Sequence, residues 1–303
     1  MDIDSVSAIG FYIVCIFVPI GVLGNIISLV VWTKGRKCST ASCSVYFRLL
    51  AVCDISCLII PGVDYLLYYN PVNKIDLLAI NGFFCKCLSF MLGFCFQMSA
   101  YVTVALTVDR TIILLFPLKR YDLRANKRAY IVCLCIAFLT FAVNLPRIWV
   151  SEISHSGYND VQTCVYILNE ATKLYLRWQF VGYQFAIPIA AVTTCNIIIL
   201  LKVKCKTEPR NDHSVQRAQV RNIAILTVSV SIVHCISTIP RLLYTLLTLG
   251  TDEIKETYGT LYKFHVISNA LLYLNHAVNC FVYCFVGSQF RQDLKEMLCR
   301  CRH

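Results

Sequence analysis

Seven apolar stretches, each close to the length of a membrane helix, constrain the fold of this 303-residue chain most strongly. A helix needs about 20 apolar residues to cross roughly 30 Å of hydrocarbon. The composition agrees, because 57% of the residues are hydrophobic and only 15% are charged. The stretches are Ile9–Trp32, Leu49–Leu67, Leu88–Val108, Ala129–Pro146, Phe180–Leu201, Ile223–Pro240 and Val266–Val286. The sequence predicts an all-α membrane protein, a bundle of seven transmembrane helices in one domain covering residues 1–303.

The expected helices follow from these stretches and their polar borders. We predict spans at about 9–33, 44–69, 84–116, 128–149, 177–204, 217–249 and 262–286. A short amphipathic helix is predicted at 288–299, on the membrane surface, because Phe290, Leu294 and Met297 share one face. Cys299 and Cys301 are candidates for palmitoylation, with two unmodified thiols as the alternative. The alternating residues 161–168 predict a small hairpin.

Basic residues are distributed unevenly between the two sides of the predicted membrane. Of the 28 lysines and arginines, 20 fall on the side that carries the links at 34–37, 110–128 and 202–221 and the C-terminal tail. Lysine and arginine collect on the cytosolic side of membrane proteins. We therefore expect a multi-pass plasma-membrane protein with its N-terminus outside and its C-terminus in the cytosol. The net charge of +11 is expected to meet anionic lipid and a cytosolic partner, not nucleic acid.

Several short motifs, in order along the spans, identify a family. They are Gly24-Asn25, Leu50-Ala51-Val52-Cys53-Asp54, Cys85, Asp109-Arg110-Thr111, Pro188, Pro240 and Asn279-Cys280-Phe281-Val282-Tyr283. With these motifs the chain resembles the rhodopsin-like G-protein-coupled receptors over nearly its whole length. The resemblance implies a receptor, not an enzyme, that activates a heterotrimeric G protein. It implies no cofactor other than an allosteric sodium ion.

Asp54 is the acidic residue nearest the middle of a predicted span. An unpaired carboxylate there costs at least about 2.5–3.5 kcal/mol, so it needs partners. In the family that this chain resembles, the positions of Ser99, Asn275 and Asn279 complete a sodium pocket around the acid, and oxygen ligands suit such a hard cation. The alternative is a hydrogen-bonded polar cluster without an ion.

The resemblance also assigns a signalling switch and a disulfide. Asp109, Arg110, Asn196 and Tyr283 are implied to form the switch that contacts the G protein, whereas the alternative for Arg110 is to extend toward lipid phosphates. Cys85 and Cys164 are implied to form a disulfide in the oxidising outer compartment. Cys87 is a rival partner, two residues from Cys85, that spacing alone does not exclude.

Polar and aromatic side chains in the outer halves of the spans form the candidate ligand site. Tyr273 stands where retinal proteins of this family carry a lysine, and Leu92 where monoamine receptors carry an aspartate, which excludes an opsin and disfavours an amine ligand. Arg241 needs an anion or acceptor inside its span, and its alternatives are an internal pair with Asp64 or extension outward. The other candidates are Phe96, Gln97, Tyr166, Phe180, Gln184, Tyr244, His265 and Asn269.

This mixture of acid, base, amide and aromatic groups suits a short neuropeptide. The run Ser44-Val45-Tyr46-Phe47-Arg48 and the Asn-His-x-x-Asn spacing look most like invertebrate receptors of the FMRFamide-like kind. One alternative is a receptor of the same fold for a lipid or an odorant. Another, from a different class, is a seven-span transporter, which would usually show repeat symmetry between its halves.

The chain departs from the family pattern at several switch positions. Thr238 replaces the tryptophan of helix six, and Cys280 replaces the proline of the seventh-helix motif. No acid stands at the base of helix six, where Val220 lies between Arg217 and Arg221. Without that acid Arg110 lacks a restraining salt bridge to this helix, so we expect signalling in the absence of ligand.

Overall fold

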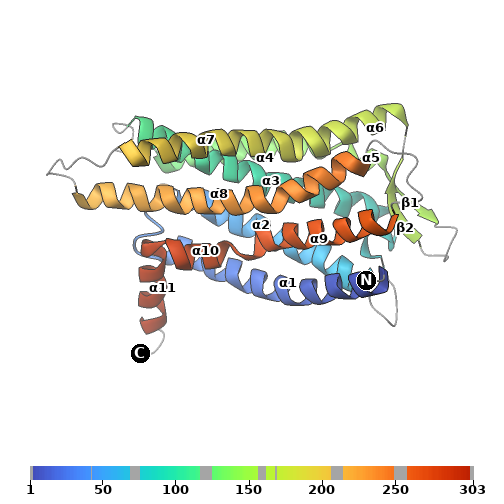
Figure 1. Ribbon diagram of the computed structural model, residues 1–303, viewed down its shortest axis with the longest axis horizontal. Helices are drawn as coiled ribbons and strands as arrows, with labels where there is room; N and C mark the ends of the chain where they lie inside the picture. The colour runs from blue at the N-terminus through green and yellow to red at the C-terminus, as the bar shows by residue number, and fades with distance from the viewer. Residues whose placement is uncertain are drawn as a thin grey trace.

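The computed structural model describes residues 3–41, 43–68, 76–116, 125–155, 162–167, 169–205, 214–248 and 258–300. Long helices lie roughly parallel along one axis (Figure 1). Among the described residues, six helices are long and apolar enough to span a membrane, and the bent pair α9 and α10 makes a seventh if counted as one span. The predicted seven-helix bundle is thereby confirmed.

The helices of the bundle begin and end close to the expected positions. They are α1 (Ile3–Lys34), α2 (Ser44–Tyr68), α3 (Gly82–Leu115), α4 (Ala125–Asn144), α7 (Ile187–Cys205), α8 (Ser214–Thr248), α9 (Tyr258–Ala277) and α10 (Asn279–Val286). Of the 18 most apolar consecutive residues in the third span, 61% are buried, against 22% in the fourth span. The third span is therefore the central helix of the bundle, which places its polar residues in protein and not in lipid.

The fifth span differs most from the expected bounds. It was predicted from residue 177, but its helical course begins with α6 (Glu170–Arg177), where the Asn169 side chain accepts from the Thr172 N–H over 2.8 Å. A stretch of π-helix, η3 (Trp178–Ala186), then joins α6 to α7. The predicted start was late because α6 is polar on one face and was not part of the apolar run.

A two-stranded sheet covers one end of the bundle. Strands β1 (Ser151–His155) and β2 (Gln162–Tyr166) pair antiparallel, with Ile153 opposite Cys164. The hairpin predicted within 161–168 is therefore wrong in extent, because that stretch supplies β2 alone. The short helices η1 (Leu77–Ala79) and α5 (Arg147–Val150) lie at the same end. We call it the hairpin end; Figure 1 places the N-terminus there.

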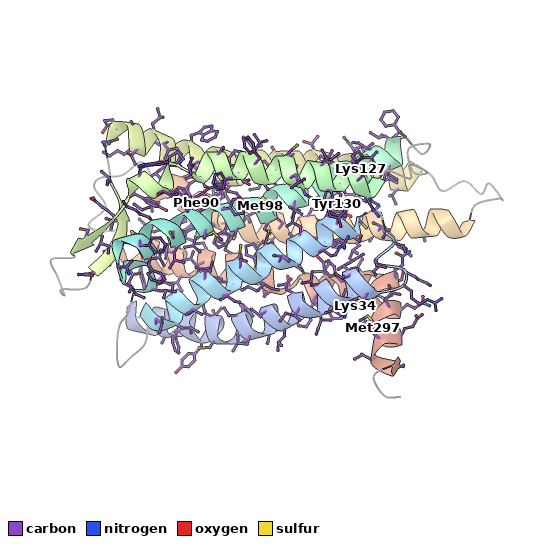
Figure 2. The ribbon with its side chains drawn as sticks, turned by 180° about the vertical axis from the view of Figure 1, so that it is seen from behind. Lys34, Phe90, Met98, Lys127, Tyr130 and Met297 are labelled. Atoms are coloured by element: carbon purple, nitrogen blue, oxygen red, sulfur yellow. A yellow bond between two sulfur atoms is a disulfide. The ribbon has the colours of Figure 1, made fainter. Side chains whose placement is uncertain are left out.

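The opposite end of the bundle carries α11 (Ser288–Arg300), which runs across the direction of the other helices (Figure 1). We call it the α11 end. Lys34, Lys127 and Met297 all lie near it, whereas Phe90 lies toward the hairpin end (Figure 2). The helix predicted at 288–299 is thus present, with bounds that differ by one residue at its end.

Candidate functional site

Asp54, in α2, is fully buried at the centre of a polar cluster. Ser99 of α3 donates its Oγ–H to Asp54 Oδ1 over 2.8 Å, and Asn279 of α10 donates through Nδ2 to Oδ2 over 2.6 Å. His276 Nδ1 of α9 lies 2.7 Å from Oδ1. Since an ionised carboxylate only accepts, Nδ1 carries the hydrogen of this bond. Three helices besides α2 therefore converge on one carboxylate.

The four-residue sodium pocket is assembled only in part. Ser99 and Asn279 reach Asp54 as expected, whereas no hydrogen bond joins Asn275 to Asp54 in the described part of the chain. Hard cations are held by oxygen lone pairs, whereas His276 and Asn279 both direct N–H groups at the carboxylate. The residues present do not fit the expected ion. The geometry matches the alternative, a hydrogen-bonded cluster without one.

The seventh span bends by 51° between α9 and α10, although it lacks the proline of the family motif. Val278 lies at the break, and the carbonyl of His276 accepts a hydrogen bond from Asn25 Nδ2 of α1 over 2.8 Å. That carbonyl is the one to which the N–H of residue 280 would donate in a continuous helix. Asn25 therefore binds the same backbone carbonyl that the proline of the family motif would leave without a hydrogen bond.

The expected switch residues lie toward the α11 end. Arg110 is only 5% exposed and pairs with the neighbouring Asp109, which Arg128 of α4 also approaches at 3.7 Å. This burial contradicts the alternative in which Arg110 extends to lipid. Asn196 of α7 accepts from Ser231 Oγ of α8 over 3.1 Å. These contacts join α3 to α4 and α7 to α8.

Tyr283 lies in an aromatic cluster that connects the α11 end to the core. Its ring meets Phe47 edge-on with centroids 5.1 Å apart, and Trp32 and Phe290 at 5.9 and 5.4 Å. The side chain is 1% exposed. In this conformation Tyr283 packs against α1, α2 and α11, so its expected role at the Arg110 switch would require it to leave this cluster.

The disulfide joins Cys85 at the start of α3 to Cys164 in β2, with the Cα atoms 5.5 Å apart. Cys87, the rival partner, is a free thiol. The bond ties the hairpin to the central helix and confirms the pairing implied by the family resemblance.

Arg241 of α8 contacts two polar residues of α9 at the hairpin end. Its Nη1 lies 3.0 Å from His265 Nδ1, and Asn269 Nδ2 lies 2.8 Å from His265 Nε2. The guanidinium also lies over the Tyr244 ring, 5.0 Å from its centroid. The alternative Arg241–Asp64 pair is not formed, and Asp64 Oδ1 instead accepts the N–H of Leu77 over 2.8 Å. Asp64 thus anchors η1.

A second polar network lies deeper, between α3, α4 and η3. Asn144 Nδ2 donates to Gln97 Oε1, and Asn144 Oδ1 accepts from Gln179 Nε2 over 2.9 Å. Arg147 Nε donates to Gln179 Oε1 over 3.1 Å, and its Nη1 donates to the Tyr166 hydroxyl over 2.8 Å. Gln97 is fully buried in this network. Its Nε2 atom has no hydrogen-bond partner among the described residues.

The remaining ligand candidates are placed as follows. Phe180 lies beneath the Arg147 guanidinium at 4.7 Å, and Phe96 meets the His276 ring edge-on with centroids 5.2 Å apart. The Tyr273 hydroxyl donates to the carbonyl of Pro61 over 3.3 Å. Gln184 is buried in η3, and Leu92 is half-buried in α3.

The match to a family model decides which class of protein this geometry belongs to. Residues 24–283 match the model described as "7 transmembrane receptor (rhodopsin family)". The chain belongs to the rhodopsin-family seven-transmembrane receptors. Its members are receptors and not enzymes, which agrees with the expectation from the motifs.

Curated relatives match most of the receptor's length at low identity. G-protein coupled receptor 54 of Oreochromis niloticus is 25% identical over 288 residues, which cover 91% of this chain and 74% of that protein. The FMRFamide receptor of Drosophila melanogaster is 27% identical over 298 residues, 90% of this chain and 50% of that protein. The allatostatin-A receptor of Bombyx mori is 24% identical over 289 residues, 92% of this chain and 76% of that protein.

Sequence reasoning missed four polar residues of the receptor. Arg147, Asn144 and Gln179 were not singled out, because their partners are distant in the chain and no spacing links them. His276 lies three residues before Asn279 and thus on the same side of a helix. A histidine inside an apolar stretch needs a partner, and this was the signal that would have added it to the Asp54 cluster.

α11 is attached to the rest of the receptor through a buried acid. Asp293, 1% exposed, accepts the backbone N–H groups of Lys37 and Cys38 over 2.9 and 2.7 Å. Burial, with Asp293 nearby, raises the pKa of the Cys38 thiol. Cys299 is exposed near the end of α11, and Cys301 lies outside the described residues.

Proposed function

We propose that this receptor binds a short peptide at the hairpin end and activates a heterotrimeric G protein at the α11 end. The relatives named for FMRFamide, allatostatin-A and galanin support a peptide ligand. The hairpin end would face outside and the α11 end the cytosol of a plasma membrane. Lys34 and Lys127 at the α11 end support this orientation (Figure 2).

One observation carries the ligand proposal, namely the polar surroundings of Arg241. Among the described residues, no carboxylate lies within ion-pair distance of this guanidinium. Its neighbours His265 and Tyr244 supply an imidazole and an aromatic face. A half-buried cation of this kind favours an acceptor from outside the chain. Peptide carbonyl and carboxylate oxygens meet that need, whereas a purely apolar lipid or odorant does not.

The G-protein side of the proposal rests on the buried Asp109–Arg110 pair at the α11 end. The aromatic cluster around Tyr283 and the attachment of α11 through Asp293 border the same end. Palmitoylation of Cys299 and Cys301 belongs to the same proposal, and the exposure of Cys299 supports it. An acyl chain there would hold α11 against the inner membrane surface.

A screen of short amidated peptides on cells expressing the receptor, read by calcium and cyclic AMP, tests the ligand proposal. At least one peptide should give a response. Arg241→Gln should then lower its potency about tenfold or more, because a hydrogen bond to a charged group contributes about 1.5–3 kcal/mol. Surface expression should not change.

Lys173→Gln is the matched control, since Lys173 is an exposed cation at the same end that pairs with Glu170 at 3.4 Å. Its potency should equal that of the wild type. Equal potency of Arg241→Gln would remove Arg241 from ligand contact. No response to any peptide, with a response to a lipid or an odorant added to the same cells, would support the non-peptide alternative.

A further inference from the structure

We propose that the His276 imidazole occupies the position beside Asp54 that a cation would take, so that an internal hydrogen bond replaces the ion. The stability of this receptor then does not respond to sodium. This inference concerns the middle of the bundle. It rests on neither the peptide nor the G protein of the proposed function.

His276 is held at three points, two on its ring and one on its backbone. Its Nδ1 lies 2.7 Å from Asp54 Oδ1, and its ring meets Phe96 edge-on at 5.2 Å between centroids. The carbonyl of the same residue accepts from Asn25 over 2.8 Å. His276 is 2% exposed. Its ring therefore has one packed position, and that position is against the carboxylate.

Three of the roughly four lone-pair positions of the Asp54 carboxylate are used by these neighbours. Oδ1 accepts from Ser99 and His276, and Oδ2 accepts from Asn279. Hard cations are bound by oxygens, for calcium at about 2.3–2.6 Å. A cation at that distance from Oδ1 would meet the hydrogen on Nδ1.

The charge state of the ring does not alter this argument. Nδ1 carries a hydrogen both in the imidazolium and in the neutral tautomer that donates to a carboxylate. In either form the ring fills the space beside Oδ1.

The ring also connects two regions of the receptor. Phe96 is one of the aromatic residues predicted to face the ligand, and it touches the imidazole that binds Asp54. A displacement of Phe96 would therefore act on Asp54 through His276, without an ion between them.

Thermal unfolding of the purified full receptor in detergent micelles, in sodium chloride and in choline chloride of equal concentration, tests the inference. An ion that binds the native state raises the melting temperature. The wild type should melt at the same temperature in both salts. His276→Ser, which removes the ring and offers an oxygen, should melt about 2–4 °C higher in sodium. The double variant Asp54→Asn with His276→Ser should lose that rise.

Three results would overturn the inference. They are a sodium-dependent rise of that size in the wild type, a folded His276→Ser that is as insensitive as the wild type, and a rise that persists in the double variant. If His276→Ser does not fold, His276→Asn supplies the same oxygen with a larger side chain, and the wild-type measurement decides by itself. No peptide or G protein is present, so failure here leaves the proposed function untouched.

Discussion

Gly93 of α3 shows how a single residue makes the buried polar network possible. A Cβ atom at this position would collide first with Asn144 Oδ1 and would lie 2.6 Å from Arg147 Nε, closer than non-bonded atoms approach. Arg147 is 3% exposed and bonded to Gln179 and Tyr166, so it has little freedom to move away. A glycine inside an apolar helix is explained here by a buried arginine from a neighbouring segment.

Gly93→Ala should destabilise the receptor by about 1–3 kcal/mol, the usual cost of overpacking a filled interior. The reason is that the added methyl group displaces Arg147 from its partners. Thermal unfolding of the purified receptor measures the effect. Gly82→Ala is the control, because a Cβ there meets nothing within 4 Å. Equal melting of the two variants would contradict the packing that we describe.

Asp293 is a second single residue with a large expected effect, because it attaches α11 to the rest of the receptor. Asp293→Ala should destabilise the receptor by about 1–3 kcal/mol, because it leaves the buried N–H groups of Lys37 and Cys38 without an acceptor. Glu296→Ala, on the same helix, should change stability by less than about 1 kcal/mol, since its pair with Arg36 is exposed and 4.0 Å long. A larger loss for Glu296→Ala would reverse this assignment.

The broken seventh span is the element in which this receptor departs furthest from its motif. Cys280 lies in the first turn of α10, and Asn25 binds the carbonyl of His276. First-turn N–H groups are not needed by the helix that they begin. The bend of 51° therefore occurs without a proline, and a side chain from α1 binds the carbonyl at the break.

Cys280→Pro should accordingly be tolerated, with a change in stability below about 1 kcal/mol, since proline is accepted in a first helical turn. Val282→Pro should cost about 3 kcal/mol or more, because the Val282 N–H donates to the Val278 carbonyl over 3.0 Å. Melting temperatures of the two variants compare them directly. A loss at Cys280 as large as that at Val282 would show that α9 and α10 behave as one continuous helix.

Some helices and strands of the receptor were predictable from the sequence, and others were not. The spans were predictable because bilayer thickness fixes the length of an apolar helix. The start of the fifth span was not, because Glu170–Arg177 is a polar extension held by the Asn169 cap and not by lipid. Strand β1 was missed because its pairing depends on β2, which the disulfide ties to α3.

Only part of the candidate site was predictable from the sequence, for a related reason. Asp54, Ser99 and Asn279 were found together because each stands in a family motif or at a family position. Arg147 was not found, because its role depends on contacts between segments that no single-sequence spacing encodes. His276 was missed although its position three residues before Asn279 was a usable signal. Asp64 and Gln97 were assigned to the ligand but are bound to Leu77 and Asn144 within the protein.

At the scale of the whole molecule, the resting state is expected to be weakly held. α8 (Ser214–Thr248) contains no Asp or Glu, so it offers no carboxylate to Arg110. Arg110 instead pairs with Asp109 of its own helix. Nothing in that pair opposes an outward movement of α8, and the active population should therefore be measurable without ligand.

Nucleotide exchange on a purified heterotrimeric G protein, catalysed by the receptor reconstituted in lipid vesicles, tests the central claim most directly. Exchange should be faster than with empty vesicles even without ligand, and faster again with a peptide that is active in the cellular screen. An exchange rate equal to that of empty vesicles, with and without that peptide, would contradict the assignment of this chain as a signalling receptor.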